Sequence, residues 1–264
     1  MMPTAYAAAA QIVSTGAVRV SWESGNSLPA MTNGAYNEAN DNLLERRIGM
    51  SQLLDMLNKH KIVAIFRGYE GEQADLAAQA LVDGGIRLIE VTMNSNDALA
   101  TIGRWRERFG RTARIGAGTV LDAAMAREAV AAGAEYLISP NLDEEAITYG
   151  VEHGISVWPG VMTPTEIVRA WKAGAEAVKI FPMGSLGWKY LAEIKAPLHH
   201  IPMLATGGVD LHTIGQYFKA GAAAVGMGSK LLNPDWVKAG EWDKLTEQAR
   251  RFVGAVTELQ ADQR

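Results

Sequence analysis

Eight short apolar runs recur along the chain after residue 60, and longer segments with helical spacing separate them. The runs are nearly continuous in apolar residues rather than alternating, which is typical of parallel strands that are buried on both faces. Such a sheet needs helices on its faces, so the pattern predicts repeated βα units. The eight runs are Ile62–Phe66, Leu88–Thr92, Ile115–Thr119, Tyr136–Pro140, Ser156–Gly160, Ala177–Pro182, Met203–Gly208 and Ala223–Ser229.

The segments between the runs carry helical signals. Gln73–Asp83 has alanine and leucine at helical spacing, and Ala123–Ala132 is rich in alanine. Glycine follows most of these segments, at the place where a helix often ends in a left-handed residue. We expect such helix ends at Gly84-Gly85, Gly133, Gly154, Gly174 and Gly221.

Eight consecutive units favour an α/β fold of the (β/α)₈ TIM-barrel type, small because its loops are short. A doubly wound open sheet is the alternative, but the chain offers no obvious point at which the order of the strands would reverse. Residues 50–264 are predicted to form this barrel. Residues 1–49 lack a hydrophobic period and mix Ser, Gly, Asn and Ala, so we expect them to be a poorly ordered N-terminal extension.

Charge and residue types exclude several classes of function. The net charge is −4 with both signs scattered, so no basic surface is offered to nucleic acid or to an anionic membrane. The chain has no cysteine, which is compatible with a reducing cytoplasm. None of its five histidines lies at the carboxyl end of a predicted strand, so no metal site is expected, and no cofactor.

Two charged residues interrupt the apolar runs. Lys179 lies in Ala177–Pro182 and Glu90 in Leu88–Thr92, and both are predicted near strand ends, where the active sites of barrels form. A buried amine is a candidate nucleophile toward carbonyl carbon, and a carboxylate beside it is a candidate acid or base. The alternatives are a lysine that reaches solvent and a structural ion pair between the two residues.

Glycines follow the last two predicted strands, in Thr206-Gly207-Gly208 and in Gly228-Ser229. In many barrels, backbone N–H groups at these two places bind phosphate, although glycine there can also serve only to make a tight turn. The chain has no nucleotide-binding loop placed for this role, so a small phosphorylated metabolite is the better prediction.

Six segments resemble the Schiff-base aldolases that act on 2-keto-3-deoxy-6-phospho sugar acids, and the resemblance runs from about Met50 nearly to the end. These enzymes are trimeric barrels that release pyruvate and glyceraldehyde 3-phosphate. The segments are Ile89-Glu90-Val91-Thr92, Gly116-Ala117-Gly118-Thr119-Val120-Leu121, Ile138-Ser139-Pro140, Pro159-Gly160-Val161, Val178-Lys179-Ile180-Phe181-Pro182 and Thr206-Gly207-Gly208-Val209.

The resemblance implies a role for each matching residue. Lys179 would form the Schiff base and Glu90 would be the general acid and base. Thr119 would orient the pyruvoyl part of the substrate, while Pro140 and Phe181 would shape its apolar pocket. The phosphate would be held by Thr206, Gly207, Gly208, Gly228 and Ser229.

One position separates the subfamilies. Gluconate-type enzymes have an arginine shortly after the catalytic glutamate, whereas this chain has Met93-Asn94-Ser95. Arg67, at the end of the first predicted strand, can hold the substrate carboxylate instead, as in the galactonate type. The resemblance therefore favours the galactonate-type substrate. Alternatives are the gluconate epimer, 4-hydroxy-2-oxoglutarate and, more distantly, a phosphate-binding sugar isomerase, which would need no nucleophilic lysine.

Overall fold

The computed structural model describes residues 9–13, 17–21, 31–32, 50 and 52–261. The chain divides into two compact units, Met1–Ile48 and Gly49–Arg264. In the first unit, β1 (Ala9–Val13), β2 (Ala17–Ser21) and β3 (Met31–Thr32) form a small antiparallel sheet in that order. The predicted lack of order before residue 50 falls mostly on residues outside the described ranges and stays a prediction.

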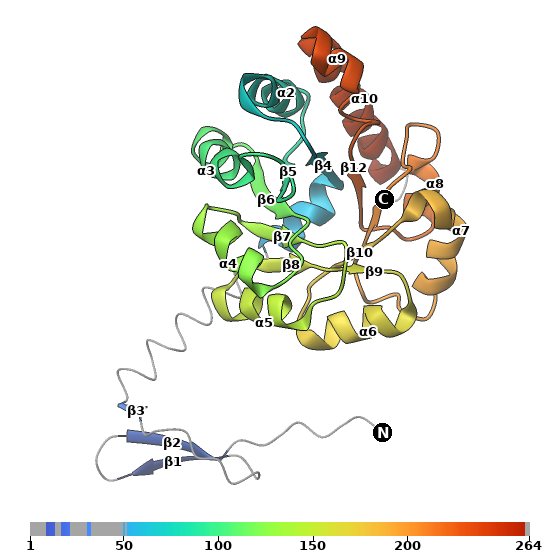
Figure 1. Cartoon of the computed structure of the whole chain (residues 1–264). Coiled ribbons are helices and arrows are strands. Elements are labelled where there is room, and N and C mark those ends of the chain that lie inside the picture. The colour runs from blue at the N-terminus through green and yellow to red at the C-terminus, as the bar shows by residue number, and fades with distance from the viewer. Residues whose placement is uncertain (1–8, 14–16, 22–30, 33–49, 51, 262–264) are drawn as a thin grey trace. The chain divides into compact units, whose positions relative to one another are not determined.

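The second unit is built on a parallel sheet whose strands lie inside a ring of helices (Figure 1). Each predicted apolar run contains strand residues, which confirms the repeated βα pattern. The order across the sheet is β8-β7-β6-β5-β4-β12-β11-β10-β9. The strands are β4 (Ile62–Phe66), β5 (Leu88–Thr92), β6 (Arg114–Gly118), β7 (Tyr136–Ile138), β8 (Ser156–Trp158), β9 (Gly160–Val161), β10 (Val178–Ile180), β11 (Met203–Thr206) and β12 (Ala224–Met227).

The two strands at the ends of this order, β8 and β9, are consecutive in the chain and are separated only by Pro159. β8 pairs with β7 on one side, and β9 pairs with β10 on the other. Proline has no N–H to donate to a strand ladder, so the run Ser156–Gly160 breaks there instead of forming the single strand that we predicted. Because the chain passes from one end of the sheet to the other at this residue, the sheet closes into the predicted (β/α)₈ barrel.

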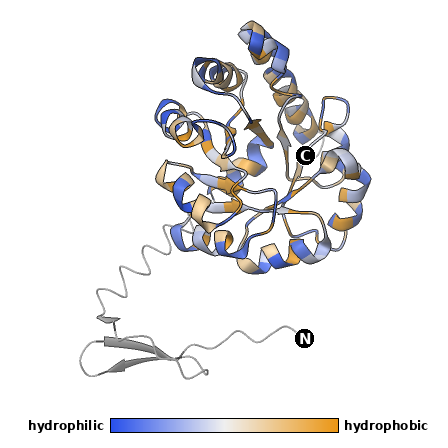
Figure 2. Cartoon of the chain, viewed as in Figure 1, coloured by the Kyte–Doolittle hydropathy of each residue, from blue (hydrophilic) through white to orange (hydrophobic). Residues whose placement is uncertain are grey.

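The helices alternate with the strands and cover the outside of the barrel, where hydrophilic and hydrophobic residues intermingle along each helix (Figure 2). They are α2 (Gly71–Asp83), α3 (Ala98–Phe109), α4 (Ala123–Ala131), α5 (Glu144–His153), α6 (Pro164–Ala173), α7 (Met183–Lys195), α8 (Ile214–Lys219), α9 (Pro234–Ala239) and α10 (Trp242–Ala261). Among the described helices, none combines the length and the apolar content that a membrane span requires.

Glycine caps the helices largely as predicted. Gly133, Gly154, Gly174 and Gly221 have positive φ, and so does Gly85 at the end of α2. At the predicted helix end Gly84-Gly85, the left-handed residue is Gly85, whereas Gly84 is right-handed with φ −78°. A Cβ at Gly84 would lie 2.4 Å from the Cβ of Ala249, so close packing against α10 explains this glycine.

The barrel interior has an apolar floor. Leu53 and Leu57, from the helical residues 52–60, belong to the same buried cluster as Leu88, Ala177 and Leu204 of the strands. Side chains two residues apart in a strand point to the same face. Leu88 is followed in this way by Glu90, Ala177 by Lys179 and Leu204 by Thr206. The period of two therefore places these three polar side chains in the barrel interior, above the apolar floor.

Candidate active site

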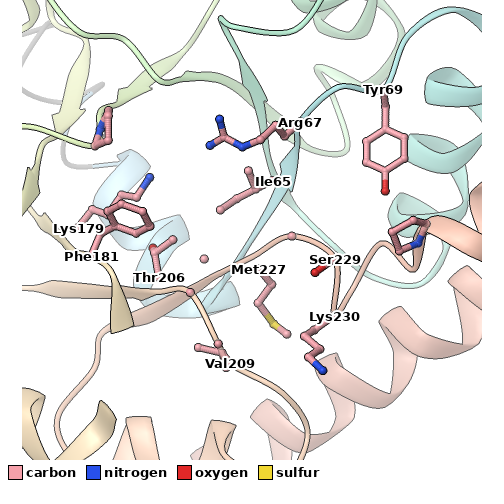
Figure 3. Close-up of a pocket in the computed structure, with 16 residues that line it drawn as sticks. Ile65, Arg67, Tyr69, Lys179, Phe181, Thr206, Val209, Met227, Ser229 and Lys230 are labelled. Carbon is pink, nitrogen blue, oxygen red and sulfur yellow. The ribbon is translucent and has the colours of Figure 1, made fainter. Parts of the chain in front are cut away.

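A cavity of about 440 Å³ lies at the carboxyl ends of the strands, where β4, β10, β11 and β12 contribute most of its walls (Figure 3). Most of the residues singled out in the sequence line it, but Glu90 and Thr119 do not. Those that line it are Arg67, Pro140, Lys179, Phe181, Thr206, Gly207, Gly208, Gly228 and Ser229.

Lys179 occupies one end of the cavity, beside Phe181 (Figure 3). The residue is only 4% exposed, and its Nζ lies 5.3 Å from the centre of the Phe181 ring. In the part of the chain that the structure describes, the Lys179 amine has neither a hydrogen-bond acceptor nor an ion-pair partner. The structural ion pair with Glu90, which the sequence left open, is therefore not formed, and the amine is available to the cavity.

Glu90 is a buried carboxyl group behind this end of the cavity. It is 1% exposed, and both carboxylate oxygens lack a hydrogen-bond partner among the described residues. Burial raises the pKa of Glu90 because it disfavours the charged form, while the positive charges of Lys179 and Arg67 act in the opposite direction. A carboxyl group whose pKa is raised in this way is a candidate to accept and return a proton during a reaction.

Gly118 makes room for this carboxyl group. A Cβ on Gly118 would lie 1.7 Å from Oε1 and 2.3 Å from Cδ of Glu90. Only a glycine fits at this position of β6 while Glu90 keeps its place.

Arg67 follows β4, is exposed, and points toward the cavity from the wall opposite Lys179 (Figure 3). Its Nη1 donates a hydrogen bond of 3.0 Å to Oδ1 of Asn94. Ser95 fixes the adjoining turn, because its Oγ accepts from the Gly68 N–H at 2.8 Å and lies 2.9 Å from the Thr92 hydroxyl. Asn94 thus supplies no charge of its own, but it orients the guanidinium.

Thr119 follows β6 with φ +58°, a left-handed conformation that is costly for a β-branched residue. Strain of this kind gathers at functional sites, which makes Thr119 a candidate even though it does not line the cavity. Pro140 approaches β9 closely, since a Cβ on Gly160 would lie 2.2 Å from the Pro140 carbonyl carbon.

The glycine segment after β11 lies against the start of α7. Gly207 and Gly208 have φ values of +101° and +71°, and a Cβ on Gly208 would lie 2.6 Å from the Cα of Gly184. Backbone groups of the segment and of the helix start are therefore close together, beside the cavity. Exposed N–H groups in such an arrangement suit an anion.

The turn after β12 is held at several points. Backbone N–H groups of Leu231 and Leu232 donate to the Gly228 carbonyl, each at 2.9 Å. The Tyr69 hydroxyl, from the segment after β4, donates to the Leu232 carbonyl at 3.3 Å. Ser229 in this turn lines the end of the cavity away from Lys179 (Figure 3).

Two side chains of this far end were missed by the sequence analysis. Tyr69 and Lys230 both line the cavity, and the exposed Lys230 ammonium has no ion-pair partner among the described residues. Lys230 directly follows Gly228-Ser229, and this proximity to a predicted phosphate segment was the available signal. Tyr69 gave no signal, because it comes from a loop whose path the strand pattern does not fix.

No group of three or more His, Cys, Asp or Glu side chains with the geometry of a metal site occurs in the described part of the chain.

Comparison with known proteins adds to this geometry. The family model described as "Aldolase: KDPG and KHG aldolase" matches residues 53–248. The 2-dehydro-3-deoxy-6-phosphogalactonate aldolase of Escherichia coli K12 is 35% identical, and the match covers 76% of this chain and 96% of the relative. A 2-dehydro-3-deoxy-phosphogluconate aldolase of Treponema pallidum is 29% identical, over 78% of this chain and all of the relative.

Solved structures of aldolases are also similar to this protein. A structure described as native KDPGal is 34% identical with a TM-score of 0.70, over 76% of this chain and 96% of that one. The KDPG aldolase of Legionella pneumophila, solved with pyruvate captured as a covalent carbinolamine, is 28% identical with a TM-score of 0.66, over 72% of this chain and 93% of that one. The protein therefore belongs to the KDPG and KHG aldolase family and is an enzyme of the carbon–carbon lyase class.

Proposed function

We propose that this enzyme cleaves 2-dehydro-3-deoxy-6-phosphogalactonate to pyruvate and D-glyceraldehyde 3-phosphate through a Schiff base on Lys179. The observation that carries the proposal is the buried Lys179 amine at the cavity wall, which has no ion-pair partner among the described residues. An amine held in an apolar site without an acid partner is suited to attack a keto group.

The reaction divides into steps that these two residues can serve. The Lys179 amine adds to the C2 keto carbon, and the carbinolamine takes up one proton from solvent and loses water to give a protonated imine. Glu90 then takes the proton of the C4 hydroxyl, the C3–C4 bond breaks, and its electrons pass to the imine as the aldehyde leaves. Glu90 returns the proton to C3 of the enamine, and hydrolysis of the imine releases pyruvate and the free lysine.

The far end of the cavity supports a phosphorylated substrate. We assign the phosphate to the backbone of Gly207, Gly208 and Gly228 and to the hydroxyls of Thr206 and Ser229, all of which line the cavity. Lys230 adds a cation there, and the described residues that line the cavity include no acidic side chain. A substrate with a keto group at C2 and a phosphate at C6 would span the two ends.

The Arg67–Asn94 hydrogen bond supports the galactonate-type substrate. A guanidinium fixed in orientation can clamp the substrate carboxylate with two parallel hydrogen bonds, and this fixes the face of the substrate that meets Glu90. We assign Thr119 to the pyruvoyl group, and Pro140 and Phe181 to the apolar wall around it.

A direct test compares kcat/KM for the two 2-dehydro-3-deoxy-6-phospho sugar acids that differ only at C4, with 4-hydroxy-2-oxoglutarate as a substrate without phosphate. We expect the galactonate compound to have the highest kcat/KM. A preference for the gluconate epimer would overturn the assignment of the sugar acid, and a preference for 4-hydroxy-2-oxoglutarate would overturn the phosphate assignment.

We also propose that the enzyme is a homotrimer. Leu121 and Met162, after β6 and β9, are 45% and 43% exposed although they are large and apolar. Exposed apolar side chains that follow the carboxyl ends of barrel strands suit contact with another copy. Light scattering should give three times the 28.4 kDa of one chain, and the mass of a monomer would contradict the proposal.

A further inference from the structure

Two stacked aromatic residues lie in the barrel interior, and one of them, Tyr136, interacts electrostatically with Glu90. Tyr136 of β7 and Trp158 of β8 are both fully buried, and their rings stack with centres 4.7 Å apart and planes 22° apart. The Tyr136 hydroxyl and the Trp158 Nε1 have no hydrogen-bond partner among the described residues, and neither do the two carboxylate oxygens of Glu90. Buried polar groups of native proteins are rarely left without a hydrogen-bond partner. Each of these groups therefore needs a partner, which another of them could offer.

Two glycines of β6 locate the phenol relative to the carboxyl group. Gly116 and Gly118 are two residues apart and face the same side of the strand. A Cβ on Gly116 would lie 2.5 Å from Cζ of Tyr136, the carbon that bears the hydroxyl. A Cβ on Gly118 would lie 1.7 Å from Oε1 of Glu90. The phenol and the carboxyl group thus cover successive interior positions of one strand.

Successive positions on one face of a strand are about 7 Å apart, and the hydroxyl oxygen extends beyond Cζ. One water molecule, or a small shift of either side chain, spans such a gap. The charged and titratable groups that face Glu90 are Lys179 on β10, Arg67 after β4 and Tyr136 on β7, while β6 presents only glycine.

The chemistry of the two groups is complementary. A phenol is a donor, and an ionised carboxylate only accepts. Burial raises the pKa of Tyr136 well above its ordinary value, and the negative charge of Glu90 adds to the increase. The phenol therefore keeps its proton, and can donate it to a hydrogen bond, at every pH below the ordinary titration range of tyrosine.

We propose that Tyr136 is a positioning residue that donates a hydrogen bond to the Glu90 carboxylate, directly or through one water, and favours its ionised form. This inference rests on the proposed role of Glu90 as the acid and base. Burial raises the pKa of Glu90, and the charges of Lys179 and Arg67 lower it. The Tyr136 hydroxyl would be a third group that lowers this pKa, as a neutral hydrogen-bond donor. The Glu90 carboxyl group would then lose its proton, and act as a base, at a lower pH than burial alone allows.

The test measures how fast the methyl protons of pyruvate exchange with deuterated solvent, as a function of pH, because this exchange reports proton transfer at the enamine carbon. In Tyr136→Phe the acidic limb of the profile should move to higher pH by about one unit, the size expected for loss of a hydrogen bond to a charged group. The direction follows because loss of a donor to the carboxylate disfavours its charged form.

Two controls distinguish a change in the ionisation of Glu90 from a general disturbance of the packing around Tyr136. Trapping of pyruvate by borohydride, which needs Lys179 but no proton transfer through Glu90, should be unchanged in Tyr136→Phe. Trp158→Phe changes the ring that stacks on Tyr136 and removes a polar atom from the same layer, and it should leave the profile where it is. Incorporation of a fluorinated, more acidic tyrosine at 136 should move the limb to lower pH without a change of ring packing.

The outcomes separate the two proposals. A Tyr136→Phe enzyme that traps pyruvate and has the same pH profile as the parent overturns the role of Tyr136 alone, and so does a shift of equal size in Trp158→Phe. A parent enzyme that traps no pyruvate overturns the proposed function, and the role of Tyr136 falls with it.

Discussion

Replacement of Gly118 by alanine tests the placement of Glu90 without removing any functional group. The new methyl group would lie 1.7 Å from the Glu90 Oε1, whereas ordinary van der Waals contact begins near 3.4 Å. The carboxyl group must therefore retreat by about 1.7 Å, or the strands must separate. Misplacement of a reacting group by about 1 Å can lower a rate by about 100-fold, which is about 2.7 kcal/mol of activation free energy.

We expect Gly118→Ala to lower kcat for aldol cleavage by at least about 100-fold, while borohydride trapping of pyruvate on Lys179 continues. Crowding in the interior should also cost about 1–3 kcal/mol of unfolding free energy. Gly254→Ala is the matched control: nothing lies within 4 Å of its added Cβ on α10, so activity should be unchanged and stability should rise by about 0.5–1 kcal/mol. Parental kcat in Gly118→Ala would refute the argument that Glu90 must keep its present position.

Further predictions concern the charged residues of the site. Glu90→Gln should trap pyruvate but slow proton exchange by roughly two to four orders of magnitude, and an exchange rate equal to the parent's would contradict its role. Because burial raises the pKa of Glu90, the parent enzyme should lose stability as the pH rises from the Glu90 pKa of the unfolded state through that of the folded state. Glu90→Gln should therefore have a higher melting temperature than the parent at pH 8, and the difference between the two melting temperatures should close toward pH 4. Arg67→Ala should mainly raise KM for the keto acid, and Asn94→Ala should do so more weakly; unchanged KM values would exclude the carboxylate clamp. Lys230→Ala should raise KM for the phosphorylated substrate in a salt-dependent way while trapping of pyruvate is unaffected, and an equal loss for both would contradict its place at the phosphate end.

The strand pattern predicted the barrel because eight buried runs with short helical connections have few other solutions. Lys179 and Glu90 were predicted to face one site because both lie near the strand ends of that barrel. The break at Pro159 was missed because the surrounding run is apolar without interruption, and only the closure of the barrel gives its two halves different partners. The reason for a glycine at position 84 could not be predicted either, because it is close packing against α10, which lies far away in the sequence.

The details of the site depend on contacts that no local pattern contains. Tyr69, in the segment after β4, reaches the turn after β12, and these two strands are neighbours in the barrel although they are its first and last strands in the chain. In the sequence, Gly116 and Gly118 are only two glycines of a predicted strand. In the structure, glycine is required at both positions because Tyr136 and Glu90 of the neighbouring strands occupy the space of a side chain. Such residues become interpretable only when the interior is assembled.

The most direct test of the central claim is borohydride reduction of the enzyme with pyruvate, followed by intact mass and peptide mapping. The proposed chemistry predicts one reduced pyruvate adduct per chain, located on Lys179, and none in Lys179→Met. Absence of an adduct, or an adduct on another lysine, would contradict it.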